Sequence, residues 1–400
     1  MTRIARNDDL MWARGFLDPA HVRQHATAVS ENGPTRAVQR GDTDPWPLPH
    51  DERDLGELPI AWTHGRKVPL SRALAESDSD ALVVLHRGRV VYESYLHGYR
   101  AHQPHLNGSA AKSYFGLLVA MIEHQGLLRR DALTRSYIPE LAGTGFGDAT
   151  VEQLMHMTTH VRFADRPYDR VLEAHRYWAV VTPSLRPQGY TGPTTILDHL
   201  ATARAAGPYG HKFRYENGNV ETMAEILRRV TGVSTAELFG ELIWSRIGAA
   251  QDGLYLLDSA GDEMACGGFA ATAMDIARLG EMLRRGGAIG DRQIIPAEVV
   301  ATIGRVPDGA TRRVTAPRAS ADAPATMSYH DFWWLLDDAH GSYMASGIHG
   351  QRLFVAPGSD LVIVHFGAHI LSPAVPPPPL VPMFAQIAAA VAGPVPETAR

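Results

Sequence analysis

The sequence predicts an α+β fold, with a central antiparallel sheet flanked by helices and a mostly helical lobe inserted into it. Two observations support this prediction. Runs of β-branched and aromatic residues occupy 81–95 and return at 332–366, whereas the apolar spacing over about 130–265 is helical. Because strand patterns lie on both sides of the helical stretch, we expect the two sets of strands to belong to one sheet.

This pattern divides the chain into three parts. Residues 1–78 mix polar residues with Pro, Gly, Asp and His and show little period, so we expect an N-terminal arm that wraps the surface. Residues 79–130 and 266–400 are expected to build the α/β sheet domain. Residues 131–265 are expected to form the inserted helical lobe.

The first strand signal lies at 81–95, where two β-branched and aromatic runs surround Arg87-Gly88. This arrangement is typical of a β-hairpin. Residues 107–122 are apolar nearly all round, which predicts a buried helix. In the lobe, 151–157 and 220–230 show helical spacing and end at glycine or loop residues.

The chain returns to the sheet after the lobe. A helix is expected over 273–287, and three strand-like runs follow at 332–336, 351–355 and 361–366. The Gly- and Asp-containing turns between these runs favour an antiparallel meander. Four consecutive prolines then predict a stiff connection into a final helix at 383–392, with a polyproline ligand for a partner as the alternative.

The composition is ordinary for a soluble globular chain, since 45% of the 400 residues are hydrophobic and 20% are charged. The formal net charge of −5 comes without an extended basic block, so nucleic acid and anionic membranes are not expected partners. The lone Cys266 excludes an internal disulfide framework. No apolar signal core opens the sequence and no run is long enough to span a membrane, so we expect a cytoplasmic protein and leave a homodimer open.

A serine and a lysine stand three residues apart at the start of the expected buried helix. Residues at i and i+3 share a helix face, so Ser109 and Lys112 would lie within reach of each other. Ser109 would occupy the first turn, where unpaired N–H groups favour a developing anion. Only three of the 38 basic residues are lysines, and a lysine, unlike an arginine, can lose its proton when burial lowers its pKa. We therefore expect Ser109 to be a nucleophile activated by Lys112; a chance spacing with a snorkelling lysine is the alternative.

A second group must carry the proton to the leaving atom. The segment 213–219, Phe-Arg-Tyr-Glu-Asn-Gly-Asn, offers Tyr215 just before a helix. A phenol beside an ammonium loses its proton more readily, so Lys112 and Tyr215 would act as one coupled base and acid. The alternative is a tyrosine that caps backbone at a helix start, with Asn217 or Asn219 as the N-cap.

A third requirement is an oxyanion donor beside the backbone N–H of Ser109. The segment 346–351, Ser-Gly-Ile-His-Gly-Gln, is bracketed by glycines, so its backbone can approach a ligand closely. The N–H of Ile348 is the candidate donor. An ordinary glycine-rich turn between strands is the alternative.

With these three motifs in order, the chain resembles the serine β-lactamase and penicillin-recognising superfamily, whose signature is Ser-x-x-Lys, Tyr-x-Asn or Ser-x-Asn, and a Lys/His-x-Gly-type strand. Within it, the sequence looks most like the 6-aminohexanoate-dimer hydrolases and the family VIII-type carboxylesterases. The motifs that carry this likeness are Ser109-Ala-Ala-Lys112-Ser113, Tyr215-x-x-x-Asn219, Cys266-Gly-Gly-Phe-Ala-Ala-Thr-Ala-Met-Asp-Ile-Ala-Arg278 and Gly347-Ile-His-Gly-Gln351.

The resemblance implies a β-lactamase-like fold with the active site between the sheet domain and the helical lobe. It also implies a catalytic cycle. Ser109 attacks the substrate carbonyl while the N–H groups of Ser109 and Ile348 hold the oxyanion. The leaving amine or alcohol is protonated through Tyr215, Lys112 keeps the network poised, and water then releases the acid.

Five further positions are expected to contact the substrate. His349 stands where penicillin-binding members usually carry a lysine, so strong β-lactamase activity is not expected, whereas the amide hydrolases have a comparable His-Gly. The second motif can be aligned with either Asn217 or Asn219. Cys266 occupies a position that lines the substrate cleft in the relatives, with a packing thiol as the default. Tyr168 falls in the loop where the amide hydrolases carry a tyrosine that helps to hold the amide nitrogen.

No metal or other cofactor is expected. His156 and His160 have the i,i+4 spacing of a metal pair, but the sequence shows neither the glutamate of a His-Glu-x-x-His motif nor an obvious third ligand. The sequence thus predicts a cofactor-free serine hydrolase that cleaves small carboxylic esters or linear amides through an acyl-enzyme. The alternatives are acyl transfer in the same site and a non-catalytic binding module of this fold.

Overall fold

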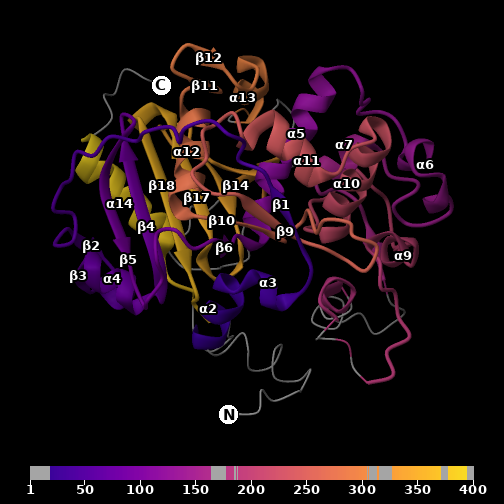
Figure 1. The fold of residues 1–400 in the computed structure, drawn as a ribbon, viewed down its shortest axis with the longest axis horizontal. Helices are drawn as coiled ribbons and strands as arrows, with labels where there is room; N and C mark the ends of the chain where they lie inside the picture. Colours follow the sequence, from indigo (N-terminus) through magenta and orange to yellow (C-terminus); the bar gives the residue numbers. More distant parts are fainter. Residues whose placement is uncertain are drawn as a thin grey trace.

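The computed structural model describes residues 19–163, 177–183, 186, 188–303, 305, 313–314, 327–370 and 377–393. Its largest element is an eight-stranded antiparallel sheet in the order β13-β14-β15-β16-β17-β18-β4-β5 (Figure 1). The strands are β4 (Ser79–His86), β5 (Arg89–Tyr95), β13 (Arg313–Val314), β14 (Met327–His330), β15 (Trp333–Leu336), β16 (Tyr343–Ser346), β17 (Arg352–Ala356) and β18 (Leu361–Gly367).

The two distant sets of strands meet at β18 and β4. These strands pair antiparallel from Leu361 opposite His86 to Gly367 opposite Ser79, which confirms the expectation of one sheet. The expected hairpin is also present. Its turn residues Arg87 and Gly88 have φ values of 51° and 76°, as a tight two-residue hairpin turn requires.

Helices cover both faces of the sheet. On one face, α4 (Leu70–Glu76) and α14 (Leu380–Ala392) pack in one apolar cluster with alternate strand residues such as Leu82. On the other face, α5 (Ala111–His124) and α12 (Ala273–Arg284) pack in a second apolar cluster with the intervening strand residues, such as Val83. Successive strand side chains point to opposite faces, and helices cover both faces. Every residue of β4 is therefore buried.

The lobe beside the sheet is mostly helical and is organised around α10 (Asn217–Thr231). This helix packs against α7 (Val151–Met155), α9 (Ile196–Ala201) and α5. Gly232, with φ of 71°, ends α10 in the left-handed conformation. The other short elements of the lobe are α6 (Thr134–Tyr137), η4 (Pro139–Leu141), β7 (Val161–Arg162), β8 (Arg204–Ala205), α11 (Thr235–Phe239) and the π-helical turn η6 (Gly240–Trp244).

A second, four-stranded sheet was not predicted. It has the order β1-β9-β10-β6 and joins the N-terminal segment to the strand that leads into Ser109. Its strands are β1 (Thr35–Val38), β6 (His105–Leu106), β9 (Gly253–Leu256) and β10 (Phe269–Ala271). Two to four residues are too few for a period of two to stand out, and the same reason explains why β14 and β16 were missed.

The remaining described elements lie at the edges of the fold. They are α2 (Pro19–Thr27), α3 (Val29–Asn32), β2 (Pro59–Ala61), η2 (Thr63–Gly65), β3 (Lys67–Pro69), β11 (Ala288–Ile289), β12 (Arg292–Gln293) and α13 (Ala297–Ile303). Among the described residues, no helix has the length and apolar character needed to cross a membrane.

Candidate active site

Ser109 lies in a 3₁₀ turn, η3 (Gly108–Ala110), between β6 and α5. Lys112 follows in the first turn of α5, and its side chain is buried. Lys112 Nζ donates to Ser109 Oγ over 3.0 Å and to the carbonyl oxygen of Cys266 over 2.6 Å. The structure therefore brings the serine and the lysine together, and it adds Cys266 as the group that anchors the ammonium.

The charge of Lys112 differs from the expectation. Burial by itself lowers the pKa of an amine, but Tyr215, Cys266 and Glu221 outweigh this effect, and the pKa of Lys112 is raised above its ordinary value. This shift favours the ammonium form of Lys112, contrary to the expectation that burial would free it to take a proton. An ammonium here can donate to Ser109 Oγ and stabilise negative charge on a neighbouring phenol.

Tyr215 is the neighbouring phenol. Lys112 Nζ lies 5.0 Å from the centroid of the Tyr215 ring, and the two side chains also share a hydrogen bond. Tyr215 is 39% exposed, so a substrate can reach it. Its ring stacks on Trp334 with a centroid distance of 6.0 Å and meets the edge of Tyr329 at 6.2 Å. This aromatic packing fixes the phenol beside Lys112.

Ile348, the candidate second oxyanion donor, begins the 3₁₀ turn η7 (Ile348–Gly350). A Cβ built on Gly108 would lie 3.5 Å from Ile348 N, and one built on Gly347 would lie only 2.2 Å from the carbonyl oxygen of Asn107. The two backbone segments therefore touch, and glycine at 347 makes this approach possible. Leading N–H groups of a helical turn have no acceptor within the turn, so those of Ser109 and Ile348 suit an oxyanion.

The two candidate asparagines have different surroundings. Asn219 is buried, where its Oδ1 accepts from Thr159 Oγ1 over 2.7 Å and its Nδ2 donates to Met157 Sδ over 3.2 Å. Asn217 is half-buried at the first residue of α10. Neither is the N-cap, because that position belongs to Glu216, whose carboxylate accepts from Gly218 N over 3.1 Å. The N-cap alternative is therefore wrong, and Asn217 is the more accessible amide.

Cys266 is buried behind Lys112 with two groups that the sequence analysis missed. Its Sγ lies 3.1 Å from Tyr177 Oη, and burial raises the pKa of the thiol well above its ordinary value. Glu221 accepts a hydrogen bond from Tyr177 and accepts from the N–H groups of Ala265 and Cys266 over 3.1 and 3.0 Å. Glu221 thus fixes the peptide segment whose carbonyl binds Lys112.

His349 is buried, and its Nδ1 lies 2.9 Å from the carbonyl oxygen of His369. Burial lowers the pKa of His349 to about 4, so the imidazole is neutral at neutral pH. It does not supply the cation that a lysine would bring to this position. Tyr168 lies outside the described residues.

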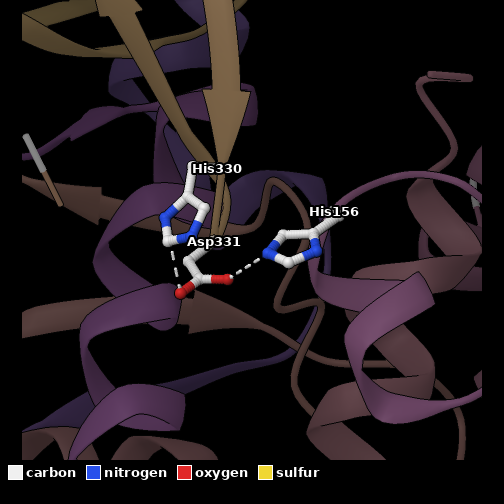
Figure 2. Close-up of side chains that lie close together, drawn as sticks. All are labelled: His156, His330 and Asp331. Carbon is white, nitrogen blue, oxygen red and sulfur yellow. Dashed lines mark ion pairs between the residues drawn. The ribbon is translucent and has the colours of Figure 1, made fainter. Parts of the chain in front are cut away.

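A buried cluster lies on the turn between β14 and β15. His156 Nε2 and Asp331 Oδ1 are 2.9 Å apart, and His330 Nδ1 lies 3.5 Å from Asp331 Oδ2, so the carboxylate sits between two imidazoles (Figure 2). The sequence analysis had considered His156 with His160 and expected no metal at that pair. Arg130 donates to both oxygens of Asp331 over 3.0 and 2.8 Å, so a guanidinium already neutralises this carboxylate. The donor set fits an ion-pair network better than a divalent metal site.

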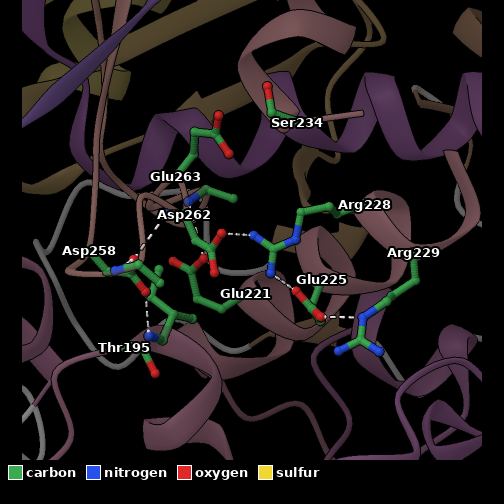
Figure 3. Close-up of polar contacts among 12 residues, drawn as sticks. Thr195, Glu221, Glu225, Arg228, Arg229, Ser234, Asp258, Asp262 and Glu263 are labelled. Atoms are coloured by element: carbon green, nitrogen blue, oxygen red, sulfur yellow. Dashed lines mark hydrogen bonds and ion pairs between the residues drawn. The ribbon is translucent and has the colours of Figure 1, made fainter. Parts of the chain in front are cut away.

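Further ion pairs brace α10 behind the site (Figure 3). Arg228 pairs with both Glu225 and Asp262, and Arg229 Nε lies 2.6 Å from Glu225 Oε1. Glu221 projects from the same helix. This network holds the helix that carries Glu221 and that begins two residues after Tyr215.

The missed groups left no clear signal in the sequence. Glu221 is an acidic residue inside a helix, and only the structure shows that it is buried with a partner. Tyr177 and Trp334 carried no local signal, because their roles depend on segments that are distant in sequence. Contacts of this kind can be found only from tertiary structure.

Comparison with known proteins gives results that agree with this geometry. A family model described as Beta-lactamase matches residues 71–367. The 6-aminohexanoate-dimer hydrolase of Paenarthrobacter ureafaciens is 29% identical over 352 residues, which cover 87% of this chain and 86% of that protein.

Two solved structures extend the comparison. A Bacillus anthracis protein assigned as a candidate 6-aminohexanoate-dimer hydrolase aligns with a TM-score of 0.84 and 31% identity, over 94% of this chain and 95% of its own. A family VIII carboxylesterase aligns with a TM-score of 0.54 and 17% identity, over 79% of this chain and 95% of its own. At that identity the carboxylesterase supports the fold alone.

Proposed function

The chain belongs to the beta-lactamase family, and on this premise we propose that it is a serine hydrolase that cleaves small carboxylic esters or linear amides through an acyl-enzyme on Ser109. The observation that carries the proposal is the 3.0 Å contact between Lys112 Nζ and Ser109 Oγ, with the Tyr215 ring 5.0 Å from the same nitrogen. The similarity to 6-aminohexanoate-dimer hydrolases makes short linear amides the first substrates to test.

Acylation begins at Ser109. Tyr215, as the phenolate stabilised by the Lys112 ammonium, takes the proton of Ser109 Oγ, and the oxygen attacks the substrate carbonyl carbon. The carbonyl π electrons move to oxygen, where the N–H groups of Ser109 and Ile348 bind the resulting oxyanion. This assigns the base role to Tyr215 and the electrostatic role to Lys112, in accord with the raised pKa of Lys112.

Collapse of the tetrahedral intermediate breaks the bond to the leaving nitrogen or oxygen. Tyr215 gives its proton to that atom, and the amine or alcohol departs. A water molecule then attacks the acyl-enzyme by the same route in reverse, with Tyr215 as its base. The acid is released, and Ser109 regains its proton. Asn217, the more accessible of the two amides, is the candidate to contact the substrate beside Tyr215.

The test is a panel of substrates with purified protein: a linear 6-aminohexanoate dimer, short-chain p-nitrophenyl esters and a chromogenic cephalosporin. We expect turnover of the ester and the linear amide and little turnover of the β-lactam, because neutral His349 provides no cation for a β-lactam carboxylate. Ser109→Ala should abolish turnover without loss of folding.

Ser113→Ala provides the matched control. Ser113 lies one helical turn further along α5, and its hydroxyl donates to the carbonyl oxygen of Phe332 over 2.7 Å. Its loss should lower the free energy of unfolding by about 1 kcal/mol and leave turnover unchanged. If folded Ser109→Ala protein turns over the ester at the wild-type rate, the proposal is wrong.

Acyl transfer is the second candidate, because the same acyl-enzyme can be attacked by an amine or an alcohol in place of water. Product analysis with added hydroxylamine or methanol separates the two reactions. A transferase would give mostly the transfer product at low acceptor concentration, whereas a hydrolase would give mostly the free acid.

A further inference from the structure

Arg352 lies beside the oxyanion turn and has no role in the mechanism given above. It is the first residue of β17 and faces Ser346 of β16 in the sheet register. Its Nη1 donates to the carbonyl oxygen of Gly347 over 2.5 Å and to that of Gln351 over 2.8 Å. Gly347 N also donates to the carbonyl oxygen of Gln351 over 2.8 Å. The guanidinium therefore ties together both ends of the turn that contains Ile348.

The carbonyl that Arg352 binds belongs to the peptide group that provides the oxyanion donor. Gly347 C=O and Ile348 N–H are parts of one planar peptide unit, and in the trans form they point in opposite directions. A donor fixed on the carbonyl therefore sets the direction of the N–H. Gly108 lies close to the same peptide, because a Cβ built on it would be 3.5 Å from Ile348 N. The peptide spans the distance from Arg352 to the turn that carries Ser109.

Arg352 is half-buried with its Nε enclosed, and its electrostatics are unusual for an arginine. Among the described residues, none of the ion pairs found with a carboxylate involves Arg352, and its Nε is buried without a hydrogen-bond partner. Burial lowers the pKa of Arg352 to about 10, so it remains a guanidinium at neutral pH. A cation that is partly removed from water and has no carboxylate partner costs folding free energy. Its charge is therefore available to the two carbonyls that it contacts.

We propose that Arg352 is a positioning residue for the oxyanion site, which aims and polarises the Gly347–Ile348 peptide so that the N–H of Ile348 binds the developing negative charge more strongly. Charge-assisted hydrogen bonds are stronger than neutral ones, and hydrogen bonds in series strengthen each other. The effect grows with the charge on the substrate oxygen. Arg352 therefore stabilises the transition state more than the bound substrate, and it acts on kcat more than on KM.

This inference rests on the proposed acyl-enzyme, so the test measures acylation directly. Arg352→Met removes both the charge and the hydrogen bonds, whereas Arg352→Lys keeps the charge and one donor. Removal of a whole oxyanion donor costs about 10²–10³ in kcat, so loss of its support should cost about 10-fold to 100-fold. We expect Arg352→Met to lower the acylation rate in a stopped-flow burst by that factor, with KM changed less than about threefold. The acylation rate of Arg352→Lys should fall between those of the wild-type protein and Arg352→Met.

Arg278→Lys is the control for the loss of an arginine contact. Arg278 is buried, and its Nε donates to the carbonyl oxygen of Trp46 over 2.9 Å while its Nη1 lies 2.8 Å from Asp275 Oδ1. This variant should lose stability and keep the wild-type acylation rate. The thermal midpoint of every variant is measured beside the burst.

Three results are decisive. A wild-type acylation rate in folded Arg352→Met protein overturns the inference. Equal losses of acylation rate in Arg352→Lys and Arg352→Met also overturn it if they parallel the decrease in thermal midpoint. A purely structural role would give that pattern. If the wild-type protein itself forms no acyl-enzyme, the proposed function fails instead, which separates the two failures.

Discussion

The chemistry of the site depends on how three side chains divide one proton and one charge. Burial would make Lys112 a neutral base, but its neighbours hold the pKa of this residue above the ordinary value. In the proposed mechanism the lysine therefore contributes charge, and the phenol of Tyr215 moves the proton. Ser109 receives a hydrogen bond from the lysine and contributes only its hydroxyl. Each role can be tested by removing one atom or one charge.

Tyr215→Phe is the sharpest test at this scale. The phenyl ring keeps the stack on Trp334 at 6.0 Å, so the free energy of unfolding should change by less than about 0.5 kcal/mol. The proton carrier is lost, and kcat should fall by about 10²–10⁴. Steady-state kinetics with the chromogenic ester measure this loss. Tyr209→Phe is the matched control, since Tyr209 donates to the Gly145 carbonyl in the lobe; kcat values that match in the two variants would rule out Tyr215 as the proton carrier.

Two of these residues could be predicted directly from the sequence, and two only from several motifs taken together. Ser109 and Lys112 share a helix face, so their contact follows from local geometry. Tyr215 and Ile348 became candidates because a proton carrier and an oxyanion donor were needed and the motifs stood in order. The anchor of Lys112 could not be found in this way, because the carbonyl of Cys266 is 154 residues further along the chain.

At the scale of elements, the site is a contact between two 3₁₀ turns. One turn, η3, leads into α5, and the other, η7, leads into β17. Neighbouring elements hold both turns. The β14–β15 turn packs on α5, where Ser113 donates to the Phe332 carbonyl, and its Asp331 and Phe332 have φ values of 47° and 67°. Such backbone strain persists only where the surroundings enforce it, and Asp331 is held by Arg130 and His156.

Gly347→Ala tests the contact between the turns. The new Cβ would lie 2.2 Å from the Asn107 carbonyl oxygen and 3.1 Å from Ala110 N, and these backbone atoms cannot rotate away. The turn should shift and displace the Ile348 N–H, so kcat should fall by about 10²–10³. Gly56→Ala is the control, because its Cβ would have no atom closer than 3.7 Å. A folded Gly347→Ala protein with wild-type kcat in the ester assay would show that the close approach does not matter for catalysis.

At the scale of the whole molecule, the α+β class and the β-lactamase-like fold predicted from the order of the motifs are confirmed. The long runs at 81–95 and 361–366 were predictable because each is an extended apolar segment with clear turn residues. The sheet of β1, β9, β10 and β6 was not, because its strands have two to four residues and gain their stability only from pairing across the chain.

Several histidines are removed from solvent by the fold, and this predicts acid sensitivity. Burial lowers the pKa of His25, His349 and His365 to about 4. An unfolded histidine titrates near its ordinary pKa of about 6.5. Between these values the unfolded chain binds more protons than the folded one, so this contribution to stability is present above pH 6.5 and is lost as the pH falls toward 4.

His365→Gln isolates one of these contributions. His365 Nε2 lies 2.7 Å from Ser79 Oγ, and its Nδ1 lies 2.7 Å from the Gly350 carbonyl oxygen. Urea unfolding at pH 7 and pH 5 gives the loss of stability on acidification for each protein. The loss should be smaller in the variant by about 2 kcal/mol at most, since each pH unit below 6.5 is worth about 1.4 kcal/mol. Equal losses in the two proteins would mean that His365 is not held neutral by the fold.

The central claim is that Ser109 carries the acyl group, and one measurement tests it directly. The protein is mixed with a short-chain p-nitrophenyl ester, quenched with acid during the burst, and examined by intact-protein and peptide mass spectrometry. The account predicts a mass increase equal to the acyl group, located on Ser109 and absent from Ser109→Ala. An adduct on another residue, or ester turnover with no adduct and no burst over a range of acyl lengths, would contradict it.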